Sequence, residues 1–321
     1  MMIERRHFLQ MVATTSLAAG LPSDVRAQAY PAAAIRLLVG FPPGNAPDTV
    51  ARLIGNQLSG LLGQSVVIEN RAGAASGIAT RLVASAPPDG YTLLQVTPAN
   101  AINPEFGGGG LFARDIAPVA SVANGPMVLV VAAASPVRSV ADVIAQARSK
   151  PDAMTIGSPG TGSTPYLAAV LFKMMTDLNI THVPFSGSAD AVNELLGGRV
   201  QVVVADMSAI ELIRAGTVRA VAVTTAKRQK ALPDVPTVAE TVPGYEASTW
   251  YGIGAPRGTP PQVIERLNAA IKSALSNQSL TERLNVLGFE PDTGPPSAFG
   301  RLVEEETAKW AKVTKFVEAK R

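Results

Sequence analysis

Two loops rich in glycine and proline are the segments of this chain whose composition suits the binding of an anion. Residues 41–47 have the sequence FPPGNAP, and residues 158–165 have the sequence SPGTGSTP. Each loop lies between a short apolar run and a segment with helical spacing of its apolar residues, which predicts a strand, a loop and a helix. The free N–H groups and positive dipole end at the start of a helix can hold an anion without Lys or Arg. Two such loops that face each other would hold a carboxylate from both sides, whereas separately each is an ordinary connection between a strand and a helix.

Asp206 is an acidic residue in a position that suits a binding role. It ends the apolar run 202–205, which predicts a buried strand. A carboxylate at the end of a buried strand accepts hydrogen bonds either from a ligand or from the first N–H groups of the next helix. Both interpretations stay open at the level of the sequence.

Recognisable catalytic motifs are absent from the sequence. There is no H-E-x-x-H, G-x-S-x-G or C-x-x-C motif, and there is no cysteine. Residues 157–163 (GSPGTGS) resemble a phosphate loop, but no Lys follows, and Gly160-x-Gly162 lacks the third glycine of a dinucleotide-binding loop. His182 lies in an expected strand and is interpreted as a structural histidine rather than a base. We therefore expect no catalytic residue, no metal site and no cofactor.

The elements that must position these loops alternate between strands and helices, which predicts an α/β fold with mostly parallel sheets. Asp48 is the expected N-cap of the helix after the first loop. After the second loop, Thr164 is the expected N-cap and Pro165 the expected first helical residue. The expected strands cover residues 35–40, 65–69, 91–96, 127–132, 154–157, 182–184, 200–205, 218–224 and 253–255. The further expected helices cover residues 79–86, 140–149, 166–176, 189–197, 261–275 and 297–318.

Length and composition limit the class of protein. The 321 residues suggest about two domains, and 47% hydrophobic with 17% charged residues exclude wholesale disorder. The formal net charge of +3 is small for this length, and basic runs interleaved with aromatic residues are absent. Nucleic acid is therefore not an expected partner.

Residues 1–29 have the pattern of a cleavable export signal. A charged start precedes an apolar, small-residue stretch, and residues 27–29 (AQA) form a signal-peptidase site. The apolar stretch is shorter than the roughly 18–20 residues that span a bilayer. Residues 5–9 (RRHFL) have the spacing of a twin-arginine signal, which we favour over an ordinary Sec signal. The mature protein is therefore expected in the periplasm.

An ordered set of short motifs runs from about residue 30 to the C-terminus. The set comprises FPPG-x-x-x-D at 41–48, VIENR-x-G at 67–73, PDGYTLL at 88–94, INP at 102–104, GS-x-G-x-GS at 157–163, LLGG at 195–198, AKR at 226–228, LPDVPTVAE at 232–240 and PGYE at 243–246. With these motifs in this order, the chain resembles the Bug-type solute-binding proteins, the extracytoplasmic receptors of tripartite tricarboxylate transporters.

The resemblance implies a two-lobed periplasmic-binding-protein fold, type II-like, in which each lobe is a mainly parallel sheet flanked by helices. It places lobe 1 at 30–130 plus 252–321 and lobe 2 at 131–251, with two hinge crossings near 127–132 and 251–255. The implied function is capture of a small carboxylate, a di- or tricarboxylate or an aromatic acid, by hinge closure and its delivery to integral membrane transporter subunits. The resemblance thus implies a receptor rather than an enzyme, and we expect a monomer.

The resemblance also implies which residues contact the ligand. Those that would hold a carboxylate from lobe 2 are Ser158, Thr161, Gly162 and Ser163. Those that would line the opposite wall are Pro43, Gly44, Asn45 and Asp48. Further contacts are expected from Thr97 and Asn100 in the loop before an Asn-Pro pair, from Phe185 in a Pro-aromatic-x-Gly turn, and from Asp206.

Three positions depart from the family pattern. Asn45 stands where the first loop usually has a second glycine, Tyr166 stands where a histidine usually follows the second loop, and residues 107–110 (GGGG) replace a longer stretch. The first two departures bear on ligand choice more than on fold. Two other functions stay open, namely a binding protein that signals to a sensor partner and a secreted enzyme that uses Asp206, His182 or a cleft serine.

Overall fold

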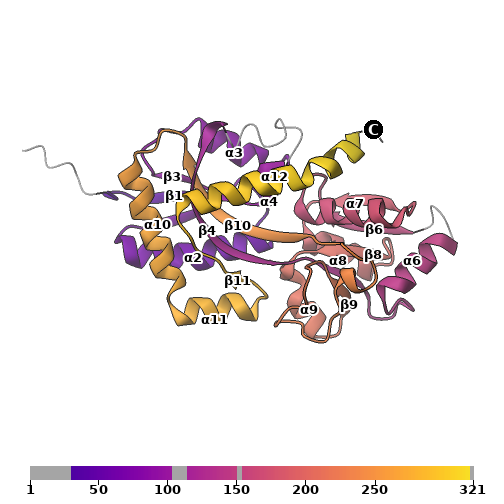
Figure 1. Cartoon of the computed structure of the whole chain (residues 1–321). Coiled ribbons are helices and arrows are strands. Elements are labelled where there is room, and N and C mark those ends of the chain that lie inside the picture. Colours follow the sequence, from indigo (N-terminus) through magenta and orange to yellow (C-terminus); the bar gives the residue numbers. More distant parts are fainter. Residues whose placement is uncertain (1–29, 103–113, 150–153, 319–321) are drawn as a thin grey trace, which may run out of the picture.

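The computed structural model describes residues 30–102, 114–149 and 154–318. The predicted export signal and the glycine loop at 107–110 lie outside these residues. The described chain forms two mixed sheets, each flanked by helices, which lie side by side along the long axis of the molecule (Figure 1). Among the described residues, no helix is both long enough and apolar enough to cross a lipid bilayer.

The first sheet has six strands. Their order is β11 (Glu290–Pro291), β4 (Ile116–Pro126), β10 (Ser248–Pro256), β3 (Thr92–Val96), β1 (Ile35–Val39) and β2 (Val66–Asn70). Strand β1 is parallel to β2 and β3, and the connecting helices are α2 (Ala46–Leu62) and α3 (Gly77–Ala84). Strand β10 is antiparallel to β3 and β4, and β11 is antiparallel to β4. The long helix α10 (Pro261–Leu275) packs on α2 and β4.

The second sheet has five strands. Their order is β7 (Thr181–Phe185), β6 (Thr155–Pro159), β8 (Val202–Ala205), β5 (Val128–Ala132) and β9 (Val218–Val223). Strand β6 is parallel to β7 and β8, whereas β5 is antiparallel to β8 and β9. The helices along this half are α6 (Val140–Ser149), α7 (Thr164–Thr176), α8 (Ser188–Leu196) and α9 (Ile210–Arg214).

The prediction of a two-lobed α/β fold is confirmed, with one difference in strand direction. Strands β1, β2 and β3, and strands β6, β7 and β8, are joined by helices and run parallel to one another, as predicted. The segments that pass between the sheets add antiparallel strands. After β4 the chain leaves the first sheet and forms β5 of the second sheet, and it later returns to the first sheet as β10, which lies between β3 and β4. Each sheet is therefore mixed rather than mainly parallel.

Helix α2 shows why the sequence positions the first loop as it does. Its residues Val50, Ile54 and Leu58 recur every four positions and are buried, so one face of the helix packs on the sheet. Gly63, with φ of 68°, ends the helix in a left-handed conformation. This packing fixes the helix and thereby the direction in which its N-terminus points.

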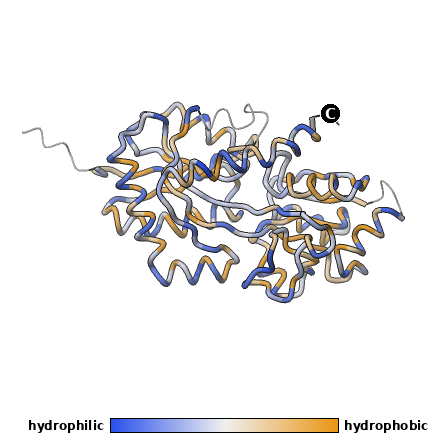
Figure 2. Tube along the Cα trace, in the orientation of Figure 1, coloured by the Kyte–Doolittle hydropathy of each residue, from blue (hydrophilic) through white to orange (hydrophobic). Residues whose placement is uncertain are grey.

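Helix α12 (Pro296–Glu318) lies across both halves of the molecule. It packs on α4 (Pro98–Ile102) and β4 of the first half and on α7 of the second (Figure 1). Trp310 is fully buried, and its indole N–H donates to Glu306 Oε2 over 2.9 Å. Figure 2 shows hydrophobic residues along most of α7 and a mixture of hydrophilic and hydrophobic residues along α10, α11 (Gln278–Val286) and α12. The apolar core thus continues from one half to the other beneath α12.

Candidate functional site

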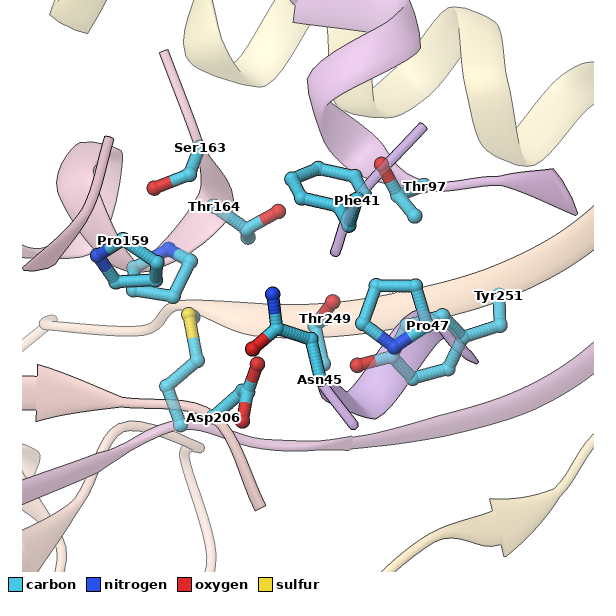
Figure 3. A pocket seen from close by; sticks show the side chains of 12 residues that line it. Phe41, Asn45, Pro47, Thr97, Pro159, Ser163, Thr164, Asp206, Thr249 and Tyr251 are labelled. Atoms are coloured by element: carbon cyan, nitrogen blue, oxygen red, sulfur yellow. The ribbon is translucent and has the colours of Figure 1, made fainter. Parts of the chain in front are cut away.

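A small inner chamber lies between the two sheets, where the loops after β1 and β6 meet (Figure 3). Its volume is about 20 Å³, which is room for about one water molecule. Its lining residues are Phe41, Asn45, Pro47, Thr97, Met127, Pro159, Ser163, Thr164, Pro165, Asp206, Thr249 and Tyr251. Both halves of the chain therefore contribute to one chamber.

A wider outer chamber of about 300 Å³ adjoins the inner one, and Phe41 and Pro159 line both. Its other lining residues are Gly40, Pro42, Ala72, Gly73, Ala75, Gly160, Thr161, Phe185 and Ser186. Neither chamber has a Lys or Arg among its described lining residues. An anion bound here would therefore depend on N–H groups, hydroxyls and helix dipoles rather than on a cationic side chain.

The conformation of the first loop is fixed by hydrogen bonds to the Asp48 carboxylate. Gly44 takes the left-handed conformation with φ of 82°, and its N–H donates to Asp48 Oδ2 over 2.9 Å. Asp48 also accepts hydrogen bonds from Arg52 Nε and Asn70 Nδ2, each over 2.9 Å. Burial raises the pKa of the Asp48 carboxyl, but these hydrogen bonds outweigh burial and hold that pKa below its usual value.

The prediction that Asp48 is the N-cap of α2 is wrong. Asn45 is the N-cap, with an extended backbone and no hydrogen bond from its side chain to the helix. Asp48 is the third helical residue, and it bonds backward to the N–H of Gly44. Because Gly44 already carries the left-handed turn, Asn45 needs no such conformation, and its side chain lies at the inner chamber.

The second loop is capped by Ser163 rather than by the predicted Thr164. Ser163 Oγ accepts from the N–H of Tyr166 over 3.2 Å and donates to the carbonyl of Gly160 over 2.9 Å. Pro165 is the second helical residue rather than the predicted first, and the first turn contains no acidic residue. The Thr164 hydroxyl points toward the centre of the inner chamber (Figure 3). The positive end of the α7 dipole therefore opens on the chamber without a neighbouring carboxylate of its own helix.

Ser158, which is buried, pairs with the half-buried His182 beside this loop. Ser158 is fully buried, and its Oγ lies 2.7 Å from His182 Nε2. The ring of Tyr166 packs edge-on against His182, with 4.7 Å between ring centroids. Burial and then the charge of Lys173 lower the pKa of His182 to about 4, so the ring is neutral at neutral pH. These contacts direct the Ser158 hydroxyl to His182, and Ser158 lines neither chamber.

Asn100 connects three segments of the first half. Its Oδ1 accepts from the backbone N–H of Thr97 over 2.7 Å, and its Nδ2 donates to Ser76 Oγ and Thr80 Oγ1. The Asn100 side chain therefore forms its hydrogen bonds within the protein, and it positions Thr97 at the wall of the inner chamber.

The structure confirms one of the two interpretations of Asp206 that the sequence left open, the helix cap. As N-cap of the short helix η2 (Met207–Ala209), its Oδ1 accepts from the N–H of Ser208 over 3.0 Å and from the Ser208 hydroxyl. Its Oδ2 lies 3.4 Å from the backbone nitrogen of Ala46, across the chamber in the other half of the molecule. Asp206 thus caps a helix and lines the chamber as well.

The structure divides the predicted ligand residues into three groups. Those at the inner chamber are Asn45, Thr97, Ser163 and Asp206. Those at the outer chamber are Thr161 and Phe185. Those that line neither chamber are Pro43, Gly44, Asp48, Asn100, Ser158 and Gly162.

Sequence reasoning did not single out the floor of the inner chamber. This floor includes Met127, where β4 passes into β5, and Thr249 and Tyr251 of β10. Burial and the nearby charge of Asp206 raise the pKa of Tyr251, which keeps its hydroxyl protonated as a hydrogen-bond donor. The signal that could have found these residues is that segments crossing between two lobes must pass beneath the cleft. Within the described ranges, no group of His, Cys, Asp and Glu side chains is arranged to hold a metal ion.

Comparison with known proteins identifies the family. Residues 50–318 match the family described as "Tripartite tricarboxylate transporter family receptor". The chain belongs to this family. Over 311 residues it is 35% identical to the protein BugT of Bordetella pertussis, covering 94% of each chain.

Two solved structures with bound carboxylates are similar to this chain. Rpa4515 of R. palustris, solved with adipate, is 40% identical, with a TM-score of 0.84 over 89% of this chain and 97% of that one. MatC (Rpa3494) of Rhodopseudomonas palustris, solved with bound malate, is 32% identical, with a TM-score of 0.82 over 88% of this chain and 99% of that one. The resemblance to Bug-type receptors is therefore confirmed, and the chain is an extracytoplasmic solute-binding protein rather than an enzyme.

Proposed function

We propose that this receptor captures a small carboxylate, a di- or tricarboxylate or an aromatic acid, between its two halves and delivers it to the membrane subunits of a tripartite transporter. The adipate and malate in the two similar solved structures support this class of ligand. The observation that carries the proposal is the N-terminus of α7, which opens on the inner chamber with a neutral cap and no acidic residue in its first turn.

The hydroxyl of Thr164 provides the test of this site. A thermal-shift screen first identifies a carboxylate that binds the natural protein. Thr164→Val keeps the shape of the side chain but removes its hydroxyl, so it should lower the affinity for that carboxylate by about tenfold or more. Calorimetric titration measures the change in Kd. Thr176→Val is the matched control, because Thr176 is buried at the far end of the same helix and donates to the carbonyl of Phe172. Equal Kd values for the carboxylate in Thr164→Val and Thr176→Val would contradict the proposed role of the α7 N-terminus in binding.

We further propose that ligand capture involves hinge closure of two lobes, at 30–130 plus 252–321 and at 131–251. The change of sheet between β4 and β5, and the return from β9 to β10, support two crossings. A direct contact across the site, from Asp206 Oδ2 to the nitrogen of Ala46, is what a closed arrangement would make. Small-angle scattering should then detect a smaller radius of gyration when a carboxylate saturates the protein.

Export by the twin-arginine route and a monomeric state complete the proposal. The RRHFL spacing of residues 5–9 supports this route. Replacing both arginines by lysine should stop export if the route is correct, and it should leave export intact if the signal is of the Sec type. Light scattering of the exported protein measures its mass and thereby tests the monomer.

A further inference from the structure

Side chains of the two halves interlock at two glycines, one in each half. Asn45, of the first half, lies over Gly187 at the start of α8, where an added Cβ would be 2.9 Å from Asn45 Oδ1. Met207, of the second half, is buried over Gly288, where an added Cβ would overlap the terminal methyl carbon Cε of Met207. In both places a side chain of one half occupies the space that a Cβ of the other half would need. The two halves therefore fit together through specific contacts.

A hydrogen bond joins the two halves at the surface. Arg214, the last residue of α9, donates from Nη2 to the carbonyl of Val286, the last residue of α11, over 2.7 Å. Its Nη1 lies 2.8 Å from Glu211 Oε1 on the same helix, which helps to orient the guanidinium. In Figure 1, α9 of the second half and α11 of the first approach each other below the crossing strands β4 and β10.

These contacts belong to one continuous segment that begins at the inner chamber. Asp206 lines the chamber, Met207 follows it as the first residue of η2, and Arg214 ends the next helix, α9. Ile210 of α9 and Leu284 of α11 are buried in the same apolar cluster. A change in the separation of the two halves at the chamber would therefore also change the separation of α9 and α11.

The residues of these two outer contacts cannot act through direct contact with the ligand. Met207, Gly288, Arg214 and Val286 line neither chamber. A residue that does not touch the ligand changes the apparent Kd by changing the fraction of the protein in the binding-competent arrangement. A contact that exists only when the two halves meet therefore strengthens the binding of every ligand by the same factor.

We infer that Met207 over Gly288 and Arg214 at the carbonyl of Val286 form a latch that assembles on closure and sets ligand affinity without touching the ligand. This inference rests on the hinge closure proposed above, and it adds the residues that hold the closed arrangement. The latch also accounts for the glycine at 288. Its φ of 81° would admit an asparagine, but the space taken by Met207 admits no side chain.

Gly288→Ala is the decisive variant, because its methyl group would collide with Met207 when the halves meet. The probes are those of succinate, malate, aspartate, glutamate and adipate that bind the natural protein after unfolding and refolding. Calorimetric titration should show each of them weakened by the same factor, about 5- to 100-fold. Gly216→Ala is the matched control, since Gly216 has φ of 70° and a Cβ there meets no atom within 4 Å. It introduces the same kind of backbone strain without the collision, so it should keep the natural Kd.

Two further variants separate the latch from a general loss of stability. Met207→Ala added to Gly288→Ala should restore most of the lost affinity, because the shorter side chain leaves room for the new methyl group. Arg214→Met removes the donor at the surface and keeps a good helix former, so the variant should fold. It should weaken each acid by about 2- to 10-fold. Glu211→Gln keeps the Arg214 donor and should leave the Kd unchanged.

A direct measurement of closure is possible because the chain has no cysteine. Ala145→Cys on α6 and Ser273→Cys on α10 place one exposed labelling site in each half. Electron–electron double resonance between spin labels at these sites measures their separation. An acid at a concentration that saturates the natural protein should shift the label distance in that protein. The same concentration should leave much of Gly288→Ala at the ligand-free distance.

Two results would overturn the inference while hinge closure stands. The first is that the acid shifts the label distance but Gly288→Ala and Arg214→Met keep the natural Kd, since the contacts would then be present in the open and the closed arrangement alike. The second is that the variants change the ratios of Kd between the acids, since the effect would then act through the ligand site. If no acid binds, or if binding leaves the label distance unchanged, the proposed capture by closure fails and the latch fails with it.

Discussion

At the scale of single residues, several polar side chains near the chambers accept hydrogen bonds from the protein's own backbone and so fix the loops around the site. Asp48 fixes Gly44, Asn100 fixes Thr97, and Ser163 caps α7. All three were predicted from the family pattern as ligand residues. A motif specifies that a side chain matters at a position, but it does not specify whether that side chain faces the ligand or the backbone beside it.

The half-buried His182 gives the first prediction, a loss of stability in acid. Its pKa is about 4 in the folded protein and about 6.5 in the unfolded chain, so the folded state favours the neutral ring. Its contribution is fully present above pH 6.5 and is lost as the pH falls toward 4, with a total effect of about 3 kcal/mol on the free energy of unfolding. Urea unfolding at a series of pH values measures it.

His182→Gln isolates this contribution from the titration of the acidic residues. Glutamine keeps an amide near Ser158 Oγ but has no proton to gain in this range. The variant should therefore lose less stability than the natural protein between pH 7.5 and 4.5. An identical loss in both proteins would show that His182 is protonated as readily in the folded state as in the unfolded one.

At the scale of elements, the strands between the two halves were the hardest to predict. Strand β4 contains two prolines and a glycine, and β10 contains two glycines, so neither has a strong strand propensity. They form because they pair with each other over most of their length, from Ser248 with Pro126 to Pro256 with Ile116. The local amino-acid composition of each strand does not predict this long-range pairing. The helix-linked strands β1, β2, β3 and β6, by contrast, were predicted close to their observed bounds.

Gly252 of β10 gives a prediction at this scale. A Cβ added at Gly252 would lie 2.1 Å from Phe299 Cζ, because the ring of this buried α12 residue packs directly on the strand backbone. Gly252→Ala should therefore displace α12 and lower the free energy of unfolding by about 1–3 kcal/mol. Urea unfolding measures the change.

Gly60 of α2 provides the matched control. A Cβ there meets no atom within 4 Å, so Gly60→Ala should raise the free energy of unfolding by up to about 1 kcal/mol through helix propensity. If both variants change stability in the same direction, the contact between β10 and α12 is not as close as described.

At the scale of the whole molecule, the two halves share one site and one bridging helix. The two-lobed architecture was implied by the ordered motifs, whereas the alternation of strands and helices alone predicted only an α/β fold. The packing of α12 on α7 could not be predicted, because the amphipathic pattern of a helix does not identify the surface it covers. The same limit applies to the chamber floor, whose Thr249 and Tyr251 come from a strand that returns from the second half.

The most direct test of the central claim is a calorimetric titration of the unfolded and refolded protein with carboxylates and their neutral amides. The ligands are succinate, malate, aspartate, glutamate and adipate, with succinamide and adipamide as neutral counterparts of equal shape. The account predicts saturable one-to-one binding of at least one acid and at least about tenfold weaker binding of its amide, because the N–H groups at α7 favour an anion. Binding of the amides as tight as that of the acids, or no binding of any acid, would contradict it.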